Sequence, residues 1–80
     1  MEVIKMIRKI KYKEWIIEYE TDHAISQLGC LLRYLTFKRN NEKVEITIYT
    51  NNVKKSIETI LLKAKETRDI LKYNEDIFLF

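Results

Sequence analysis

The sequence contains very few of the residues from which catalytic and metal sites are usually built. Its 80 residues include one histidine, one cysteine, one glycine and no proline. A metal site usually needs three or four ligands, and a nucleophile needs a base held close to it. His23 and Cys30 are too few for such arrangements, and a single glycine cannot form a glycine-rich phosphate loop. The composition therefore predicts a protein that acts by binding, with no enzymatic activity, cofactor or metal.

Two further absences bear on where the protein works. The apolar runs at 15–17 and 60–62 are far shorter than the roughly 20 residues that cross a bilayer, so no membrane contact is expected. The basic residues near the amino terminus are not followed by an apolar segment with a cleavage site, which argues against a secretory signal. A single cysteine, with no partner in the chain, is typical of a reducing compartment. We expect a cytoplasmic protein.

What is present favours one folded domain over residues 1–80. Hydrophobic residues make up 46% of the chain, enough to offset the entropy of ordering a domain of this size. The net charge of +3, from 15 basic and 12 acidic side chains, is common for a mixed protein surface. Charge alone therefore does not indicate a nucleic-acid ligand.

Hydrophobic periodicity assigns the first half of the chain. Val3, Met6, Ile7 and Ile10 recur at helical spacing, which predicts a short amphipathic helix over Glu2–Lys11. The alternation from Trp15 to Glu20 has the period of a strand, and the polar residues 21–26 are typical of a turn.

Two apolar runs, 31–37 and 44–49, flank the polar segment 38–43 and predict an antiparallel hairpin. Asn40 and Asn41 suit its turn because asparagine tolerates the left-handed conformation. A helix over Ala24–Lys38 is the alternative, since Ile25, Leu28, Leu32 and Leu35 also fit helical spacing.

The second half predicts a long helix that begins after Asn51 and Asn52, which offer an N-cap, and ends near Tyr73 and Asn74. An apolar tail, Ile77–Phe80, follows. The predicted fold class is α+β, with a short N-terminal helix, a three-stranded antiparallel sheet and a long C-terminal helix.

Two features of this arrangement suggest contact with a partner. The exposed edges of a three-stranded sheet can pair with another chain, and the apolar tail could pack against another protein or fold back over its own sheet. The polar hairpin and the tail are then expected to make the contacts. The predicted partner-binding residues are Arg33, Lys38, Arg39, Asn40, Asn41, Lys43, Ile77, Phe78 and Phe80.

A family resemblance adds to this reading. The segment Met-Ile-Arg-Lys-Ile-Lys-Tyr-Lys before a strand, and Asp22 followed by Ile25-Ser26-Gln27-Leu28, resemble the small phage-encoded anti-CRISPR inhibitors of the helix, three strands, helix type. The resemblance is to the type II-A inhibitor that mimics the DNA beside the nuclease target. This chain departs from that inhibitor in being basic, so mimicry of DNA phosphates is not implied.

The leading hypothesis is a small, non-enzymatic viral protein that binds and inhibits a host protein complex, such as a CRISPR effector, in the host cytoplasm. One alternative is a basic nucleic-acid-binding regulator that uses Arg33, Lys38, Arg39 and Lys43 on phosphates. Another is a homodimer whose subunits exchange their apolar tails.

Overall fold

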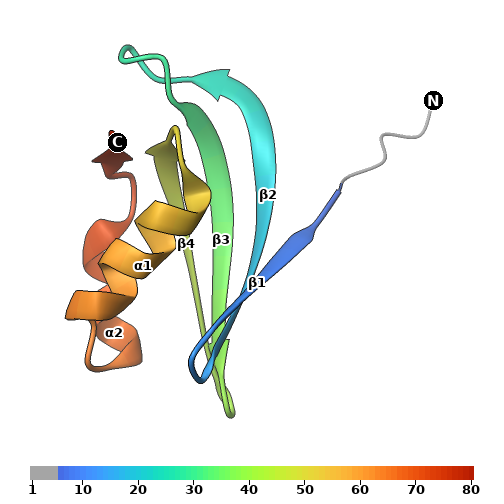
Figure 1. Ribbon diagram of the computed structural model, residues 1–80, viewed down its shortest axis with the longest axis vertical. Helices are drawn as coiled ribbons and strands as arrows, with labels where there is room; N and C mark the ends of the chain where they lie inside the picture. Colours follow the sequence, from blue (N-terminus) through green and yellow to red (C-terminus); the bar gives the residue numbers. More distant parts are fainter. Residues whose placement is uncertain (1–5) are drawn as a thin grey trace.

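The computed structural model describes residues 6–80, and these form a curled five-stranded sheet with helices packed against one face (Figure 1). The strand order is β1-β2-β3-β4-β5. Strands β1 to β4 pair with one another in antiparallel fashion, and β5 runs parallel to β4. The elements are β1 (Arg8–Tyr12), β2 (Trp15–Ile25), β3 (Leu31–Arg39), β4 (Glu42–Thr50), α1 (Val53–Lys63), α2 (Thr67–Ile70), the 3-10 turn η1 (Leu71–Tyr73) and β5 (Ile77–Phe78).

The core lies between the sheet and α1, on what we call the inner face of the sheet. Alternate residues of the central strands point to this face because successive side chains on a strand take opposite sides. Helix α1 covers them with apolar residues at three and four residue spacing. The buried side chains are Trp15, Ile17, Leu35, Phe37, Val44, Ile46, Ile48, Val53, Ile57, Ile60, Leu61 and Ile70. Within residues 6–80, no helix lies on the opposite, outer face of the sheet (Figure 1).

The turns depend on residues that accept a left-handed backbone. Asn40, at φ 54°, turns β3 into β4, and this confirms the predicted hairpin. Lys13 makes the turn between β1 and β2 at φ 55°. Gly29, at φ 85°, lies in the loop between β2 and β3, where the absence of a Cβ removes the usual steric cost.

The expected N-terminal helix is wrong where the structure can test it. Residues 1–5 lie outside the described part of the chain, and Arg8–Tyr12 is strand β1. The helical spacing of Met6, Ile7 and Ile10 competes with the alternation of lysine and apolar residues from Lys9 to Tyr12, which suits a strand. Pairing with β2 decides between them because Ile10 then lies opposite the buried Ile17.

The segment expected to be a turn, residues 21–26, mostly continues β2, which ends at Ile25. The alternative helix over Ala24–Lys38 is also wrong, because Leu31–Arg39 is a strand paired on both sides. The sheet therefore has more strands and a longer β2 than the three-stranded sheet predicted from the sequence.

The predicted long C-terminal helix is wrong as well, because the chain leaves the helical conformation at Ala64, where ψ is 119°. The Asp69 carboxylate accepts the backbone N–H groups of Lys65 and Glu66 at 3.0 and 2.9 Å. These contacts form part of a capping box that begins α2 at Thr67. A local side-chain acceptor thus competes with helix continuation, and the break lets Ile70 join the core.

The apolar tail folds back on its own sheet. Ile77 and Phe78 form β5 beside the end of β4. The side-chain amide of Asn51 exchanges two hydrogen bonds with the backbone of Phe80, at 3.0 and 3.1 Å. The ring of Phe78 stacks on that of Phe80 and tilts against that of Tyr73. These contacts hold the tail on the chain's own β4.

Candidate interaction site at the edge of β2

Strand β2 is longer than the strand that pairs with its outer side. Strand β1 covers β2 only from Trp15 to Tyr19, and then diverges from it (Figure 1). From Glu20 to Ile25, this side of β2 has no strand partner among residues 6–80. An unpaired edge presents backbone N–H and C=O groups that another chain can bind. We call residues 20–25 the open edge of β2.

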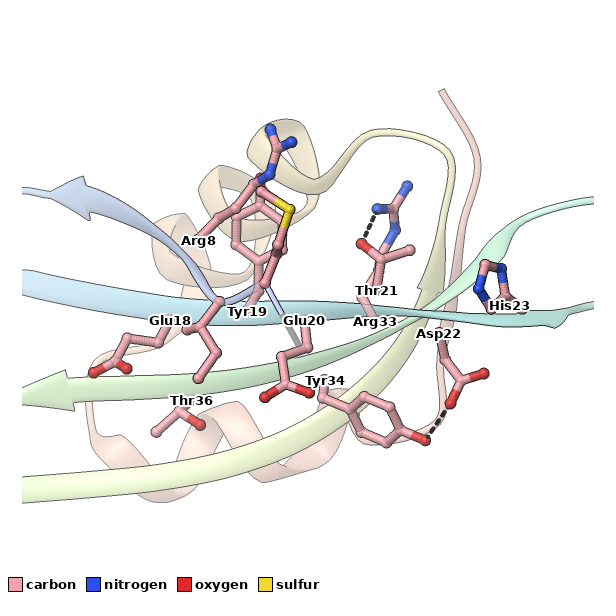
Figure 2. Close-up of a pocket in the computed structure, with 12 residues that line it drawn as sticks. Arg8, Glu18, Tyr19, Glu20, Thr21, Asp22, His23, Arg33, Tyr34 and Thr36 are labelled. Carbon is pink, nitrogen blue, oxygen red and sulfur yellow. Dashed lines mark hydrogen bonds between the residues drawn. The ribbon is translucent and has the colours of Figure 1, made fainter. Parts of the chain in front are cut away.

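An open hollow of about 920 Å³ surrounds this edge. It is lined by three residues before and at the start of β1, and by residues of β2 and β3 (Figure 2). Met6 and Ile7 lie in it with 68% and 55% of their surface exposed. The hollow reaches both faces of the sheet around one strand, so it suits an extended segment better than a small enclosed substrate.

On the outer face, β2 presents carboxylates. Glu18, Glu20 and Asp22 all point to this side (Figure 2). Asp22 accepts the backbone N–H of Ala24 at 3.0 Å and the hydroxyl of Tyr34 at 3.1 Å. Both hydrogen bonds lower the pKa of Asp22 below its usual value, and the bond from Ala24 has the larger effect. The bond from Tyr34 to the Asp22 carboxylate also raises the pKa of Tyr34.

Glu18 has a cationic partner on the same face. Lys38 of β3 donates to its carboxylate, and this hydrogen bond is the main reason that the pKa of Glu18 is lowered. Among the described residues, no ion pair forms at Glu20, which is half-buried beside the open edge. The outer side of the edge is therefore acidic.

On the inner face, the hollow is lined by cations from the two neighbouring strands, Arg8 of β1 and Arg33 of β3. Arg8, Thr21, His23 and Arg33 point to this side, away from the three carboxylates (Figure 2). Arg33 donates from Nη1 to the hydroxyl of Thr21 at 2.5 Å. Its Nε is enclosed and makes no hydrogen bond within the described residues. No carboxylate that lines the hollow lies on this side, so the inner side of the edge is basic.

Strand alternation produces this separation of charge. The sequence from Glu18 to His23 places an acid at every second position, with Tyr19, Thr21 and His23 between. Because neighbouring side chains on a strand point in opposite directions, all the acids reach one face. Arg8 and Arg33 then approach the other face from the strands on either side of β2, opposite Tyr19 and Thr21 respectively.

The predicted partner-binding residues do not form one surface. Arg33 lies at the hollow, near one end of β3. Lys38 and Lys43 are cross-strand neighbours on the outer face, and each is paired with a carboxylate, Lys38 with Glu18 and Lys43 with Glu45. Arg39 lies on the inner face, stacked over the Trp15 ring at 4.2 Å with Glu42 3.8 Å away.

The hairpin turn and the tail lie at opposite ends of β4. Asn40 and Asn41 precede Glu42, whereas Ile77 and Phe78 pair with Tyr49 and Thr50. The nine residues of β4 span about 27 Å at 3.3 to 3.4 Å per residue. Phe80, with 52% of its surface exposed, is on the tail side with Ile77 and Phe78. A single small partner surface cannot contact both groups.

Sequence reasoning missed most of the residues that surround the open edge. Arg8 was assigned to a helix, and Asp22 and His23 were assigned to a turn. The signal that could have found them is the continued alternation from Glu18 to His23, which extends the strand through the expected turn.

No family model matches the chain, and no curated protein or solved structure matches it either. Among residues 6–80, no three His, Cys, Asp or Glu side chains come close enough together to hold a metal ion. From Met6 onward, no helix is long and apolar enough to cross a membrane. The function is therefore inferred from the geometry of the open edge alone.

Proposed function

We propose that this protein binds an extended segment of another protein by strand addition at the open edge of β2. The single observation that supports this is the length mismatch between β1 and β2, which leaves Glu20–Ile25 without a strand partner among the described residues. In strand addition, backbone hydrogen bonds give affinity and alternate side chains give specificity.

The charges of the two faces define the partner. Side chains of an added strand alternate between the faces, as those of β2 do. Those on the outer face meet Glu20 and Asp22, and those on the inner face meet Arg8 and Arg33 (Figure 2). The occupant is therefore an extended segment with basic residues at one set of alternate positions and acidic residues at the other.

The other edges of the sheet are less suitable for strand addition. Strand β5 pairs over only two residues, which is too short to anchor a partner strand. The free side of β1 carries Arg8, Lys9 and Lys11 in a run of five residues, and closely spaced cations, lysine above all, are a common device against edge pairing. The open edge of β2 is longer than β1 and has the apolar side chains of Met6 and Ile7 beside it. Its pairing with β3 shifts register between Thr21 and Ile25, so the regular part of the edge lies before that shift.

A selection from displayed random peptides, followed by hydrogen exchange, tests the proposal. Enriched peptides should carry the alternating charge pattern and should slow exchange of amides within 20–25. The amides of α1 serve as the internal control and should not change. Failure to enrich any peptide, or protection only outside the open edge, would contradict strand addition.

Two charge reversals on the outer face make a matched pair for the same assay. Glu20→Lys should weaken binding of the selected peptides because it replaces an attraction with a repulsion. Glu45→Lys lies on the same face of β4, where Glu45 pairs with Lys43, and should leave binding unchanged. Equal effects of the two variants would mean that the peptide binds the outer face in general and not the open edge.

Inhibition of a CRISPR effector stays a hypothesis. In it, the effector is the protein that contributes the extended segment bound at the open edge of β2. Its direct test is cleavage of target DNA by a type II-A effector in the presence of saturating protein. Loss of cleavage would support the hypothesis, and Glu20→Lys should then restore cleavage if the open edge makes the contact. Unchanged cleavage would remove this partner and leave the strand-addition test unaffected.

A further inference from the structure

The inner side of the open edge contains an arginine that has no carboxylate partner among residues 6–80. Arg33 is partly buried, yet the only hydrogen bond that its side chain makes among these residues is to the hydroxyl of Thr21. Its Nε is enclosed and unpaired. A buried donor without an acceptor is uncommon in folded proteins, so this guanidinium calls for an explanation.

Arg39 shows that the fold does supply partners to an arginine on this face. It lies on the same strand and the same face, six positions from Arg33, and it has both an aromatic ring and a carboxylate. Arg33 has neither among the described residues. The difference therefore belongs to the site and is not a general property of arginine in this sheet.

The neighbours of Arg33 are suited to an oxyanion. Thr21 places a hydroxyl beside the guanidinium, and Arg8 of β1 lines the same hollow as a second cation on the same face (Figure 2). A planar guanidinium binds carboxylate and phosphate with two parallel donors. The carboxylates of Glu18, Glu20 and Asp22 are on the other face and leave this side free for an anion.

We propose that Arg8, Thr21 and Arg33 form an oxyanion site that takes the carboxylate of an acidic residue on the added strand. The inference rests on the proposed function, since it names the group that the inner face selects. A nucleic acid is the less suitable source of the oxyanion. A polyphosphate backbone along this edge would also approach Glu20 and Asp22, and like charges repel at such distances.

The first experiment tests the oxyanion site without any peptide. Side-chain Nε–Hε signals of the arginines are followed by NMR while sodium acetate, and separately inorganic phosphate, is added at constant ionic strength. The Arg33 signal should shift and saturate, whereas that of Arg39 should stay in place. If neither signal moves, or both move equally, the oxyanion site is disproved.

The second experiment identifies the bearer of the carboxylate with pairs of selected peptides that differ by Glu or Gln at one inner-face position. The Glu peptide should bind about tenfold more tightly, as expected for one charge-assisted hydrogen bond. Arg33→Gln should abolish this difference, and Arg39→Gln should preserve it. An equal affinity of the Glu and Gln peptides for the native chain would overturn the proposal.

The two proposals can fail separately. Peptides that protect the open edge without any preference for Glu would leave strand addition standing and remove the oxyanion site. A shift of the Arg33 signal with acetate, but no bound peptide, would leave an anion site. It would overturn the assignment of that site to an acidic residue on an added strand. A single-stranded oligothymidylate that displaces acetate from Arg33, with affinity falling steeply with salt, would assign the site to nucleic acid instead.

Discussion

The two ends of the inner face differ in how they treat an arginine of β3. At one end, Arg39 stacks on Trp15, which packs edge-on against Phe37 with ring centroids 6.3 Å apart. At the other end, Arg33 has only the hydroxyl of Thr21 among the described residues. One arginine is held by contacts within the fold, and the other lines the open hollow. Under the proposal above, two residues of one type on one strand have different roles, stability at Arg39 and recognition at Arg33.

The largest effect is expected from the core beside Arg39. Phe37 is fully buried, and Phe37→Ala should lower the free energy of unfolding by about 3 to 5 kcal/mol because it leaves a cavity. Urea denaturation measures this loss. Thr21→Ala, on the same face beside Arg33, should change stability by less than about 0.5 kcal/mol. Similar losses at both ends would mean that the Arg33 end is packed as tightly as the core.

A smaller effect is expected from Arg39 itself. Arg39→Gln removes the cation over the Trp15 ring and its contact with Glu42, and should cost about 1 kcal/mol. The urea midpoint should fall while the slope of the transition stays constant. Loss of stability that disappears in high salt would assign the effect to Glu42 and not to the ring, since only the ion pair is strongly screened.

Acid sensitivity compares two aspartates outside the core. The pKa of Asp69 is lowered mainly by the backbone N–H groups of Glu66 and Lys65, and that of Asp22 mainly by the N–H of Ala24. A folded pKa below the unfolded value adds stability above the ordinary aspartate value of 3.8. That stability is lost as the pH falls from this value through the folded pKa.

Asp69→Asn and Asp22→Asn should each flatten the fall of the unfolding free energy below this pH. Denaturation at a series of pH values checks both variants. Asp69 joins α2 to α1 through the capping box, whereas Asp22 lies beside the open edge. Acid profiles identical to that of the native chain would show that neither carboxylate contributes.

The smallest effect on stability is expected at Arg33. Arg33→Gln breaks one hydrogen bond to an exposed hydroxyl and removes a charge with no carboxylate partner, so the free energy of unfolding should change by less than about 0.5 kcal/mol. Thermal and urea unfolding measure it. A loss as large as that of Arg39→Gln would break the comparison and make Arg33 a structural residue. A gain in stability would strengthen it, because an uncompensated buried charge had been removed.

Sequence reasoning succeeded where one local signal acted alone. The hairpin between β3 and β4 was predicted from two apolar runs and two asparagines, and the start of the helix at Val53 was predicted from its N-cap. Asn52 does accept the backbone N–H of Lys55 at 3.1 Å. At the candidate site, Arg33 was predicted to bind a partner, and this stays a prediction, but the neighbouring strand β2 was expected to end at residue 20 and in fact continues to Ile25.

The errors arose where two periodicities or two acceptors competed. Met6, Ile7 and Ile10 fit a helix, but Ile10, which is partly buried, packs against the core through the pairing of β1 with β2. The apolar stripe from Val53 to Leu71 fits one helix, but the carboxylate of Asp69 captures the N–H groups on which continuation depends. Neither outcome is visible from spacing alone, because each depends on a partner that folding brings into place.

The sequence by itself determined the alternation of acids along β2, the asparagine turn between β3 and β4, and the scarcity of histidine, cysteine and glycine. The tertiary structure decided that β1 stops pairing at Tyr19 and that Arg8 and Arg33 approach one face from opposite sides. It also decided that, among residues 6–80, Arg39 obtains a ring and a carboxylate while Arg33 obtains only a hydroxyl. The physical reason is that alternation is a local property of the backbone, whereas the register and length of strand pairing depend on contacts between distant residues.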